Sequence, residues 1–537
     1  MLVHEFLINS AALRPDKAAL VCGQQRLAYK ELDILSDRLA VTLVEMGITR
    51  QDRVIIFLEN SLESVIAMFA ILKAGGVFIM LNPDMKANKL SFILKDSEAK
   101  GLIGHTGKFA VINDAMMDTN TLENIIWCED GDTDLHLMER STRPDMETIL
   151  WSGIMNNHGS VPTDKLPRCI DVDLATIIYT SGSTGEPKGV VSTHYNMVAA
   201  AASITSYLKN REDDIILNTL PLSFDYGLYQ VVMAALFGGT VVLEKSFTYP
   251  YAVIERLVQE KVTGFPIVPT MVAILLQLES LGKYDFSSLR YMTNTAAALP
   301  VSYIEKLQAF FPHVTIFSMY GLTECKRVAY LPPEELKRKP SSVGIAIPNE
   351  EVFIVGADGN RVGPKEVGEL VVRGSNVMQG YWKRPEETAK TFKPGRYRGE
   401  TLLYTGDLFT MDEEGFLYFV ARKDDLIKTR GERVSPKEIE NCLCSLPGIV
   451  EAAVIGVPDE ILGQAIKAFL VTGKEARLTQ DDVLKHCSKN LESFMVPKYL
   501  EFHEILPKSA SGKIDKKKLK TMTESKEDIP DPLQAQQ

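Results

Sequence analysis

The chain has 537 residues, of which 45% are apolar and 24% charged, and its net charge at pH 7 is −11. This length provides for several domains and a large enzyme core, with the composition of a globular protein. The acidic balance excludes a general nucleic-acid binder, because such a protein needs a basic surface to neutralise phosphates.

The first residues, Met1–Phe6, lack the basic start and the apolar stretch of a signal peptide. The longest apolar runs, such as Val65–Leu72, are too short to span a bilayer. We therefore expect a cytoplasmic protein without membrane insertion. Its seven cysteines are scattered, and Cys442-Leu-Cys444 lacks the spacing of a zinc site, so neither disulfides nor a structural metal is expected.

Helical and strand periodicities alternate from the N-terminus. Helices are predicted at Tyr29–Met46 and Leu62–Ala74, and strands at Asp52–Phe57 and Val77–Leu81. This rhythm predicts a mostly parallel sheet with helices on its faces, which is an α/β fold. Residues 152–168 are rich in Gly, Asn, Pro and Asp and are predicted to form a loop.

The next strand, Leu174–Ile178, leads into Tyr179–Gly189, which holds three glycines, four Ser/Thr hydroxyls and one lysine. Open backbone N–H groups, hydroxyl donors and a mobile cation suit an anion, which we interpret as the polyphosphate of a nucleotide. The spacing fits neither the P-loop nor the dinucleotide pattern, and a flexible Ser/Gly linker is the alternative. The candidate ligand-binding residues are Thr180, Ser181, Gly182, Ser183, Thr184, Gly185 and Lys188.

The α/β alternation resumes from Thr193 to about residue 317, and Ser318–Glu324 follows it. In that segment Tyr320 can offer an aromatic face to a base, and Gly321 permits close backbone approach. Glu324 offers a hard oxygen ligand of the kind that Mg²⁺ uses together with nucleotide phosphates. A turn followed by a helix cap is the alternative interpretation.

From Val352 onward, short strands of period 2 predict a small β-rich subdomain. Within it, Asp407 and Arg422 could accept and donate hydrogen bonds at the two hydroxyls of a ribose. The Gly380-Tyr-Trp382 string is interpreted as turn and packing. A polar break at Arg422–Leu426 marks the boundary between a large domain, residues 1–422, and a small α+β domain, residues 423–521. Residues 522–537 are predicted to be a disordered tail.

Near the end, Lys513 follows Ser511-Gly512 on a loop from which a cation could be moved into a site. Such a cation would favour a transition state in which negative charge gathers on phosphate and carboxylate groups. Several lysines lie nearby, so a solvated basic face is the alternative. The other lysines of this run are assigned to that face.

These motifs, in this order, resemble the adenylate-forming superfamily of acyl-CoA synthetases, luciferases and adenylation domains of nonribosomal peptide synthetases. The resemblance implies a large N-terminal domain of mixed sheets and a small mobile C-terminal domain. It implies ATP and Mg²⁺ as cofactors, with Tyr320 and Gly321 at the adenine, Thr323 at the α-phosphate, Glu324 at the metal, and Asp407 and Arg422 at the ribose. Lys513, Thr323 and Lys188 are the implied catalytic residues. Ser318 and Thr295–Ala297 depart from the usual family residues around the adenine.

The resemblance further implies a hinge at Asp424, for which a helix cap is the alternative. A tunnel for a phosphopantetheine thiol is implied at Lys428 and Gly431. Ala421 stands where glycine is usual. The small domain would turn about the hinge between two half-reactions.

By alignment with the family, the acid-binding pocket comprises Phe224, Asp225, Tyr226, Tyr229, Met292, Asn294, Met319, Arg327 and Val328. A Phe-Asp pair at this place resembles peptide-synthetase domains, in which the carboxylate holds the substrate's α-ammonium group, since a buried carboxylate needs a cation. A turn or cap role for Asp225 is the alternative. Arg327 is expected to point outward, with pairing to a polar substrate as the other possibility.

The first hypothesis is therefore an ATP-dependent ligase that adenylates an amino acid and transfers it to the phosphopantetheine thiol of a separate carrier protein. An acyl-CoA synthetase acting on a small or aryl acid is the alternative. A non-catalytic nucleotide-binding protein and an oxidative, luciferase-like enzyme are hypotheses of other classes.

Overall fold

A mixed sheet near the N-terminus has the strand order β19-β9-β8-β4-β3-β5-β6-β7 in the computed structural model. The structure describes residues 1–117, 119–129, 143, 146–157, 159, 161–181, 186–295, 299–423, 425–429, 432–459, 461–473, 476–509 and 513–527. Neighbouring strands from β8 to β7 are parallel, whereas β9 pairs antiparallel with β8 and β19. The strands are β3 (Arg53–Phe57), β4 (Val77–Met80), β5 (Gly101–His105), β6 (Asn124–Cys128), β7 (Glu147–Leu150), β8 (Leu174–Ser181), β9 (Pro187–Thr193) and β19 (Gly380–Tyr381).

A second mixed sheet has the order β16-β15-β14-β13-β12-β10-β11-β1-β2 and is parallel from β14 to β1. Its central strands are almost wholly buried and mostly apolar, as expected where helices cover both faces of a parallel sheet. The strands are β1 (Ala18–Cys22), β2 (Gln25–Ala28), β10 (Ile215–Asn218), β11 (Thr240–Leu243), β12 (Gly264–Ile267), β13 (Tyr291–Asn294), β14 (Thr315–Tyr320), β15 (Ala329–Tyr330) and β16 (Ile345–Ala346).

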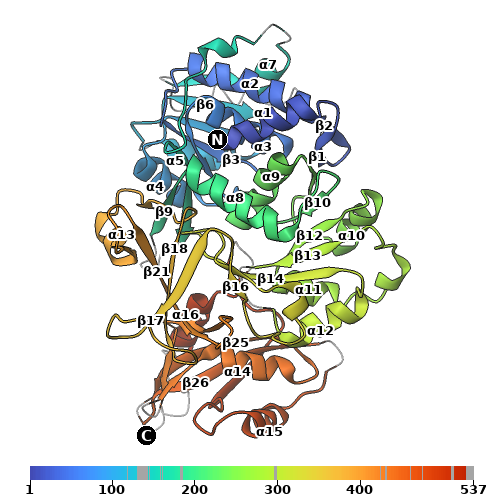
Figure 1. Cartoon of the computed structure of the whole chain (residues 1–537), viewed down its shortest axis with the longest axis vertical. Coiled ribbons are helices and arrows are strands. Elements are labelled where there is room, and N and C mark those ends of the chain that lie inside the picture. The colour runs from blue at the N-terminus through green and yellow to red at the C-terminus, as the bar shows by residue number, and fades with distance from the viewer. Residues whose placement is uncertain are drawn as a thin grey trace, which may run out of the picture.

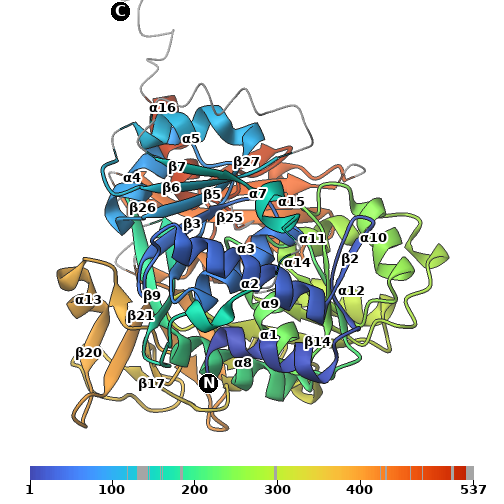
Figure 2. The same ribbon diagram turned by 90° about the horizontal axis from the view of Figure 1, so that it is seen from above.

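Helices lie between and outside these sheets (Figures 1 and 2). Helix α3 contacts β3 and β4 of one sheet and β1 of the other, and it packs beside α1 and α2. Helices α8 and α9 contact each other, α8 against β8 and β9 and α9 against β10 and β11. The helices of this part are α1 (Val3–Leu13), α2 (Tyr29–Glu45), α3 (Leu62–Lys73), α4 (Ala87–Ser97), α5 (Phe109–Met116), α7 (Trp151–Met155), α8 (His194–Leu208), α9 (Asp225–Phe237), α10 (Pro250–Gln259), α11 (Pro269–Leu275) and α12 (Val301–Phe310).

A smaller antiparallel sheet follows, in the order β17-β18-β21-β20 with β22 paired to β21, and confirms the β-rich segment after Val352. Its long strand β21 alternates buried and less buried residues, which is the period-2 pattern of a half-covered sheet. Its elements are β17 (Glu350–Val355), β18 (Gly368–Gly374), α13 (Pro385–Thr391), β20 (Phe392–Pro394), β21 (Thr401–Met411) and β22 (Leu417–Arg422).

The C-terminal segment forms its own sheet, β24-β23-β26-β25 with β27 parallel to β26, and its own buried apolar core. It lies at one end of the molecule in Figure 1, beneath β14 and α12. Because one sheet ends at Arg422 and the next begins at Ile427, we propose the domain boundary directly after residue 422. The elements are β23 (Ile427–Thr429), β24 (Glu432–Val434), α14 (Pro436–Ser445), β25 (Ile449–Asp459), β26 (Gly463–Thr472), α15 (Gln480–Asn490), β27 (Tyr499–His503) and α16 (Lys516–Glu527).

Most predicted elements agree with the structure, which confirms the α/β fold class. Helices α2 and α3 begin at the predicted residues, and α3 ends before Gly75, whose φ of +75° suits the glycine. Two expectations are wrong. Residues 152–155 belong to helix α7 rather than to a loop, and residues 522–527 belong to helix α16 rather than to a disordered tail. Of the remaining tail, residues 528–537 lie outside the described residues.

Among the described residues, no helix is both long enough and apolar enough to cross a membrane. The seven cysteines, all of them described, are free thiols.

Candidate active site

The predicted phosphate loop joins strands β8 and β9, which pair with Thr180 opposite Lys188. Gly182, Ser183, Thr184 and Gly185 lie outside the described residues. The lysine ammonium lies over the Tyr381 ring, 5.7 Å from its centroid, within the range of a cation–π contact. Gly189 is required by packing, because a Cβ there would lie 2.6 Å from the Ile177 side chain. The hairpin thus holds Lys188 beside the loop that the sequence assigned to a nucleotide.

The Ser318–Glu324 segment forms the end of β14 and the turn after it. Gly321 is needed there, since a Cβ would come within 2.3 Å of the Lys326 carbonyl oxygen. The turn brings the Glu324 carboxylate to the Tyr381 hydroxyl, which donates a hydrogen bond to Oε1 at 2.8 Å. Burial raises the pKa of Tyr381, and the neighbouring Glu324 carboxylate raises it further. Glu324, Tyr381 and Lys188 therefore form one polar cluster.

This cluster fits a Mg²⁺ ion shared with a nucleotide. No group of three or more His, Cys, Asp or Glu side chains in the described part of the chain could hold a metal ion alone. A Mg²⁺ ion bound to a nucleotide needs only one or two protein carboxylates, because phosphate oxygens and waters complete its coordination shell. The half-buried Glu324 offers one such carboxylate. Glu324 is the residue that would hold it.

The predicted ribose pair, Asp407 and Arg422, stands directly across strands β21 and β22. Arg422 Nη1 lies 3.2 Å from Asp407 Oδ1, and the Tyr320 hydroxyl donates to Asp407 Oδ2. Burial raises the pKa of Asp407, while the positive charge of Arg422 and the Tyr320 hydrogen bond oppose the rise. Apart from this ion pair with Arg422, Asp407 Oδ1 is buried without a hydrogen-bond partner among the described residues. A buried carboxylate oxygen left in this state is suited to accept a ligand hydroxyl.

Lys513 enters this cluster from the small domain. Its ammonium group interacts electrostatically with Asp225, Asp407, Glu324 and Arg422 of the large domain. The Lys513 residue is exposed to solvent. Desolvation by the surrounding protein nevertheless lowers the pKa of its ammonium group, whereas the carboxylates of Asp225, Asp407 and Glu324 raise that pKa. The lysine, although exposed, is therefore within electrostatic reach of the candidate ligand-binding residues, and its role toward a ligand stays a prediction.

Contacts between the domains hold this arrangement. The Tyr303 hydroxyl of α12 donates to the Val450 carbonyl of β25, and the Ser435 hydroxyl donates to the Val420 carbonyl of β22. Within the small domain, the backbone carbonyl of Lys513 accepts a hydrogen bond from the backbone amide of Ser509 at 2.7 Å. The small domain is thus docked in the position that delivers the lysine.

The lowered pKa of Lys513 predicts an alkaline limit to its action. Only the ammonium form can stabilise developing negative charge, so the rate should fall as pH rises through the pKa of this lysine, below the ordinary lysine value of about 10.4. Arginine stays charged over this range. We expect Lys513→Arg to be slower than the wild type but to lose the alkaline fall. A pH profile of acid-dependent pyrophosphate exchange measures both; the same alkaline limb in the arginine variant would contradict the assignment.

The predicted acid pocket lies at the start of α9 and the carboxyl ends of β13 and β14, the edge where α/β sheets bind ligands. The first turn of α9 requires a glycine at position 227, because a Cβ there would lie 2.4 Å from the Pro221 carbonyl oxygen. The Tyr226 hydroxyl donates to the Thr293 carbonyl at 2.6 Å, and Tyr229 is buried with no hydrogen-bond partner for its hydroxyl. Met292, Asn294, Met319 and Val328 are buried as well, whereas Phe224 is partly exposed. Their roles toward a substrate stay predictions.

Asp225 is the first residue of α9, directly after the N-cap Phe224, so it is not the cap that the alternative interpretation proposed; it is buried and belongs to the charged cluster. Besides Lys513, it faces the ammonium group of Lys326, a residue that is 3% exposed and donates to the Thr323 carbonyl at 2.9 Å. Burial lowers the pKa of Lys326, and the charges of Asp225 and Glu324 raise it. The chain itself therefore supplies cations to Asp225.

The expectation that Arg327 points outward is wrong. The residue is 3% exposed, its guanidinium carbon lies 5.0 Å from the centroid of the Tyr226 ring, and Nη1 donates to the hydroxyl of Thr295 at 3.4 Å. The turn after Glu324 folds back against β13 instead of continuing as a helix, because β15 returns antiparallel to β14. Arg327 is thereby carried into the predicted acid pocket.

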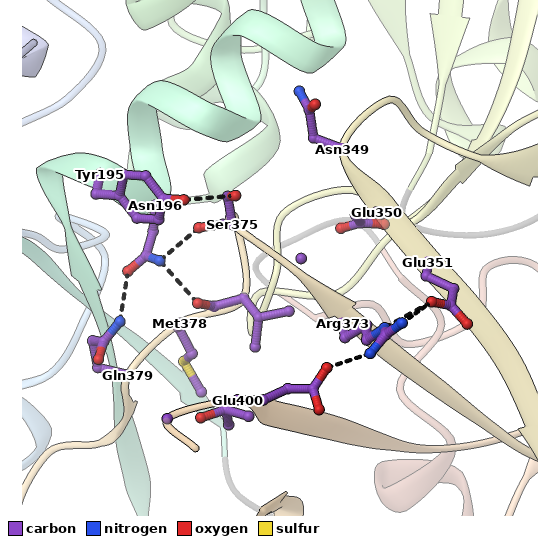
Figure 3. Close-up of a pocket in the computed structure, with 14 residues that line it drawn as sticks. Tyr195, Asn196, Asn349, Glu350, Glu351, Arg373, Ser375, Met378, Gln379 and Glu400 are labelled. Atoms are coloured by element: carbon purple, nitrogen blue, oxygen red, sulfur yellow. Dashed lines mark hydrogen bonds and ion pairs between the residues drawn. The ribbon is translucent and has the colours of Figure 1, made fainter. Parts of the chain in front are cut away.

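A polar cavity of about 270 Å³ joins several of these groups, with Glu324, Tyr381, Tyr404 and Arg422 in its wall. A larger cavity of about 590 Å³ lies beside α8 and the β17–β18 hairpin and shares none of the predicted site residues. Three of its charged side chains are engaged with one another, since Arg373 pairs with both Glu351 and Glu400 (Figure 3). We therefore place the active site at the smaller cavity.

The described residues leave the hinge and tunnel predictions open. Asp424 and Gly431 lie outside them. Lys428 is exposed on β23, where its backbone amide donates to the Gln464 side chain at 2.7 Å.

Three residues were missed by inspection of the sequence. Tyr381 was assigned to packing, although its hydroxyl binds Glu324. Lys326 and Tyr207 were not considered; Tyr207 donates to the Met319 sulfur and interacts with Arg327. Lys326 and Arg327 are two adjacent charged residues between buried strands, and this was the one feature of the sequence that could have pointed to a buried charge here.

Residues 7–382 match the family model described as AMP-binding enzyme, and residues 438–513 match the model described as AMP-binding enzyme C-terminal domain. The chain is 31% identical to a long-chain-fatty-acid–CoA ligase of Bacillus subtilis (strain 168), over 96% of this chain and 94% of that protein.

Two solved structures are similar over nearly the whole chain. ATP-bound MatB from Rhodopseudomonas palustris has a TM-score of 0.84 at 26% identity, covering 99% of this chain and 100% of that one. The o-succinylbenzoate CoA synthetase MenE from Bacillus subtilis, in complex with its acyl-adenylate intermediate OSB-AMP, has a TM-score of 0.80 at 29% identity. That match covers 96% of this chain and 97% of MenE.

Proposed function

The chain belongs to the family of AMP-binding enzymes and is an AMP-forming acid–thiol ligase, and from this premise we propose that it converts a carboxylic acid, ATP and coenzyme A into an acyl-CoA, AMP and pyrophosphate. The observation that carries the proposal is the insertion of Lys513 among Asp407, Arg422, Glu324 and Asp225. The CoA ligases among the relatives and neighbours support coenzyme A as the acceptor.

In the first half-reaction, a carboxylate oxygen of the acid attacks the α-phosphorus of ATP. The new bond is an acyl–phosphate bond, and the bond from the α-phosphorus to the bridging oxygen breaks, so that pyrophosphate leaves with its electron pair. We propose that Lys513 stabilises the charge that gathers on the α-phosphate and carboxylate oxygens. A Mg²⁺ ion held at Glu324 would neutralise charge on the phosphates.

The remaining residues bind and orient the nucleotide. Asp407 and Arg422 are placed to hold the ribose hydroxyls, and Tyr320, fixed through its hydroxyl to Asp407, presents its ring for the adenine. Lys188 and the loop before it are assigned to the phosphates, with Thr323 at the α-phosphate. Holding both reactants in place removes much of the entropic part of the barrier.

In the second half-reaction, the coenzyme A thiolate attacks the acyl carbon and AMP leaves. Lys513 now occupies the site, so the small domain must withdraw before a thiol can approach the adenylate. We propose that Asp424 is the hinge and that Lys428 and Gly431 then face the thiol channel.

The amino-acid hypothesis loses its physical support. It required a substrate ammonium to neutralise the buried Asp225, but Lys326 and Lys513 of this chain already face that carboxylate. A separate carrier protein is likewise not needed to account for the residues present.

A product assay tests the proposal directly. The protein is incubated with ATP, Mg²⁺, a panel of carboxylic acids and amino acids, and either coenzyme A or a phosphopantetheinylated carrier protein. We expect AMP, pyrophosphate and an acyl-CoA detected by mass spectrometry for at least one acid without an amino group. Transfer of amino acids alone, and to the carrier protein alone, would overturn both the acceptor and the substrate class.

A further inference from the structure

Arg327 is a buried cation without an ionic partner in the part of the chain that the structure describes. Its Nη1 donates to the Lys326 carbonyl at 3.0 Å and to the Thr295 hydroxyl, but its Nε is buried with no hydrogen-bond partner. The buried Glu350 does not compensate it, because burial raises the pKa of that carboxyl group well above its ordinary value and its side-chain partner is Asn376. A buried charge that lacks a partner costs several kcal/mol.

The other charges of the site are matched. Asp407 pairs with Arg422, and the carboxylates of Asp225 and Glu324 face the ammonium groups of Lys326 and Lys513. These three carboxylates meet Arg422, Lys326 and Lys513, and the partly exposed Lys188 lies over the Tyr381 ring. Among the described residues of the site, Arg327 is the buried cation that no carboxylate faces, and it lies against an aromatic ring.

The Tyr229 hydroxyl is a second buried polar group without a hydrogen-bond partner in the same pocket. Asp225, Tyr226 and Tyr229 share one face of α9, because residues three and four apart lie next to each other on a helix. Tyr229 interacts electrostatically with both Asp225 and Arg327, and Arg327 lies over the ring of Tyr226 on the same helix. Asp225 also interacts with Lys513, whereas the main electrostatic partners of Lys513 do not include Arg327.

We propose that Arg327 and the Tyr229 hydroxyl bind a second carboxylate at the far end of the substrate, so that the preferred acids are dicarboxylic acids. This inference rests on the proposed function. A carboxylate is an acceptor-only anion that satisfies both Nε of an arginine and a tyrosine hydroxyl. A plain alkyl chain would leave both donors unsatisfied and the guanidinium charge uncompensated.

The test compares dicarboxylic acids with monocarboxylic acids of the same length. Acyl-CoA formation is followed for unbranched and aromatic pairs that differ only in the terminal group. We expect the wild type to favour the best diacid over its partner by roughly tenfold to a hundredfold in kcat/KM, the value of a charged hydrogen bond. Arg327→Met should lose this preference by lowering kcat/KM for the diacid alone, and Tyr229→Phe should lose a smaller part of it.

Arg290 provides the matched control. Like Arg327 it lies over a tyrosine ring, 4.7 Å from the Tyr291 centroid, but it is paired with Asp214 at 2.6 Å. Arg290→Met should lower the Tm and leave the acid preference unchanged. Arg327→Met should keep or raise the Tm of the ligand-free protein, because it removes an uncompensated buried charge.

Equal use of mono- and dicarboxylic acids by the wild type would overturn the inference, as would an equal loss for both acids in Arg327→Met. If that variant does not fold, Tyr229→Phe decides: an unchanged preference is evidence against the second-carboxylate site. Failure to make a thioester from any acid would instead contradict the proposed function, so the two failures are distinguishable.

Discussion

Replacing Lys513 by alanine is expected to slow adenylate formation about a hundred- to a thousandfold while ATP still binds. The ammonium group is a cation that the small domain contributes to the cluster of Asp225, Asp407 and Glu324. Removing a group that stabilises charge developing in a transition state typically costs this much in rate. Acid-dependent pyrophosphate exchange gives the rate, and calorimetric titration with a nonhydrolysable ATP analogue gives the binding.

The same variant separates the two half-reactions. Supplied with a synthetic acyl adenylate and coenzyme A, Lys513→Ala should form the thioester at nearly the wild-type rate, because the lysine must leave before the thiol arrives. Lys518→Ala, an exposed position on helix α16 of the same basic run, is the control and should change neither step. Normal adenylation in Lys513→Ala would show that the lysine has no part in the chemistry.

Asp407→Asn is expected to raise the KM for ATP roughly tenfold to a hundredfold, with a much smaller change in kcat. The carboxylate is buried, accepts from Tyr320 and pairs with Arg422, and its Oδ1 has no hydrogen-bond partner. The amide keeps the shape but loses the charge and one acceptor. Ribose binding is the same in the ground and transition states, so the loss should fall on binding.

Steady-state kinetics at varied ATP concentration measures this effect. Glu413→Gln provides the control, since that carboxylate is exposed and pairs with Lys365 at the surface of the same sheet. An unchanged KM, or a fall in kcat alone, would place Asp407 outside the ribose site.

Parts of this molecule that depend on local chemistry could be predicted from the sequence. The buried strand β4 and helix α3 follow from continuous or periodic apolar runs, and Gly75 ends that helix by its positive φ. The placement of Asp407 beside Arg422 follows from the hairpin of β21 and β22, whose strands are close in sequence. That Glu324 and Lys188 belong to one site followed from the family resemblance and not from a local pattern. The interpretation of residues 152–155 failed because tertiary contacts of α7 with α2 outweigh its poor helix composition.

The rest depends on contacts between distant segments. No local pattern shows that Tyr381 reaches Glu324 or that Arg327 folds back onto Tyr226. The amino-acid hypothesis, which is not confirmed, rested on the same kind of gap. The charge on Asp225 called for a cation, but the sequence alone could not show that Lys326 and Lys513 converge on it.

The central claim is that the carboxylate of the acid attacks the α-phosphorus of ATP. Its most direct test uses an acid that carries oxygen-18 in its carboxylate, turned over to the acyl-CoA, with the isotope content of every phosphate product read by mass spectrometry. The account predicts one labelled oxygen in AMP and none in pyrophosphate. Label in inorganic phosphate together with ADP, or unlabelled AMP, would contradict it.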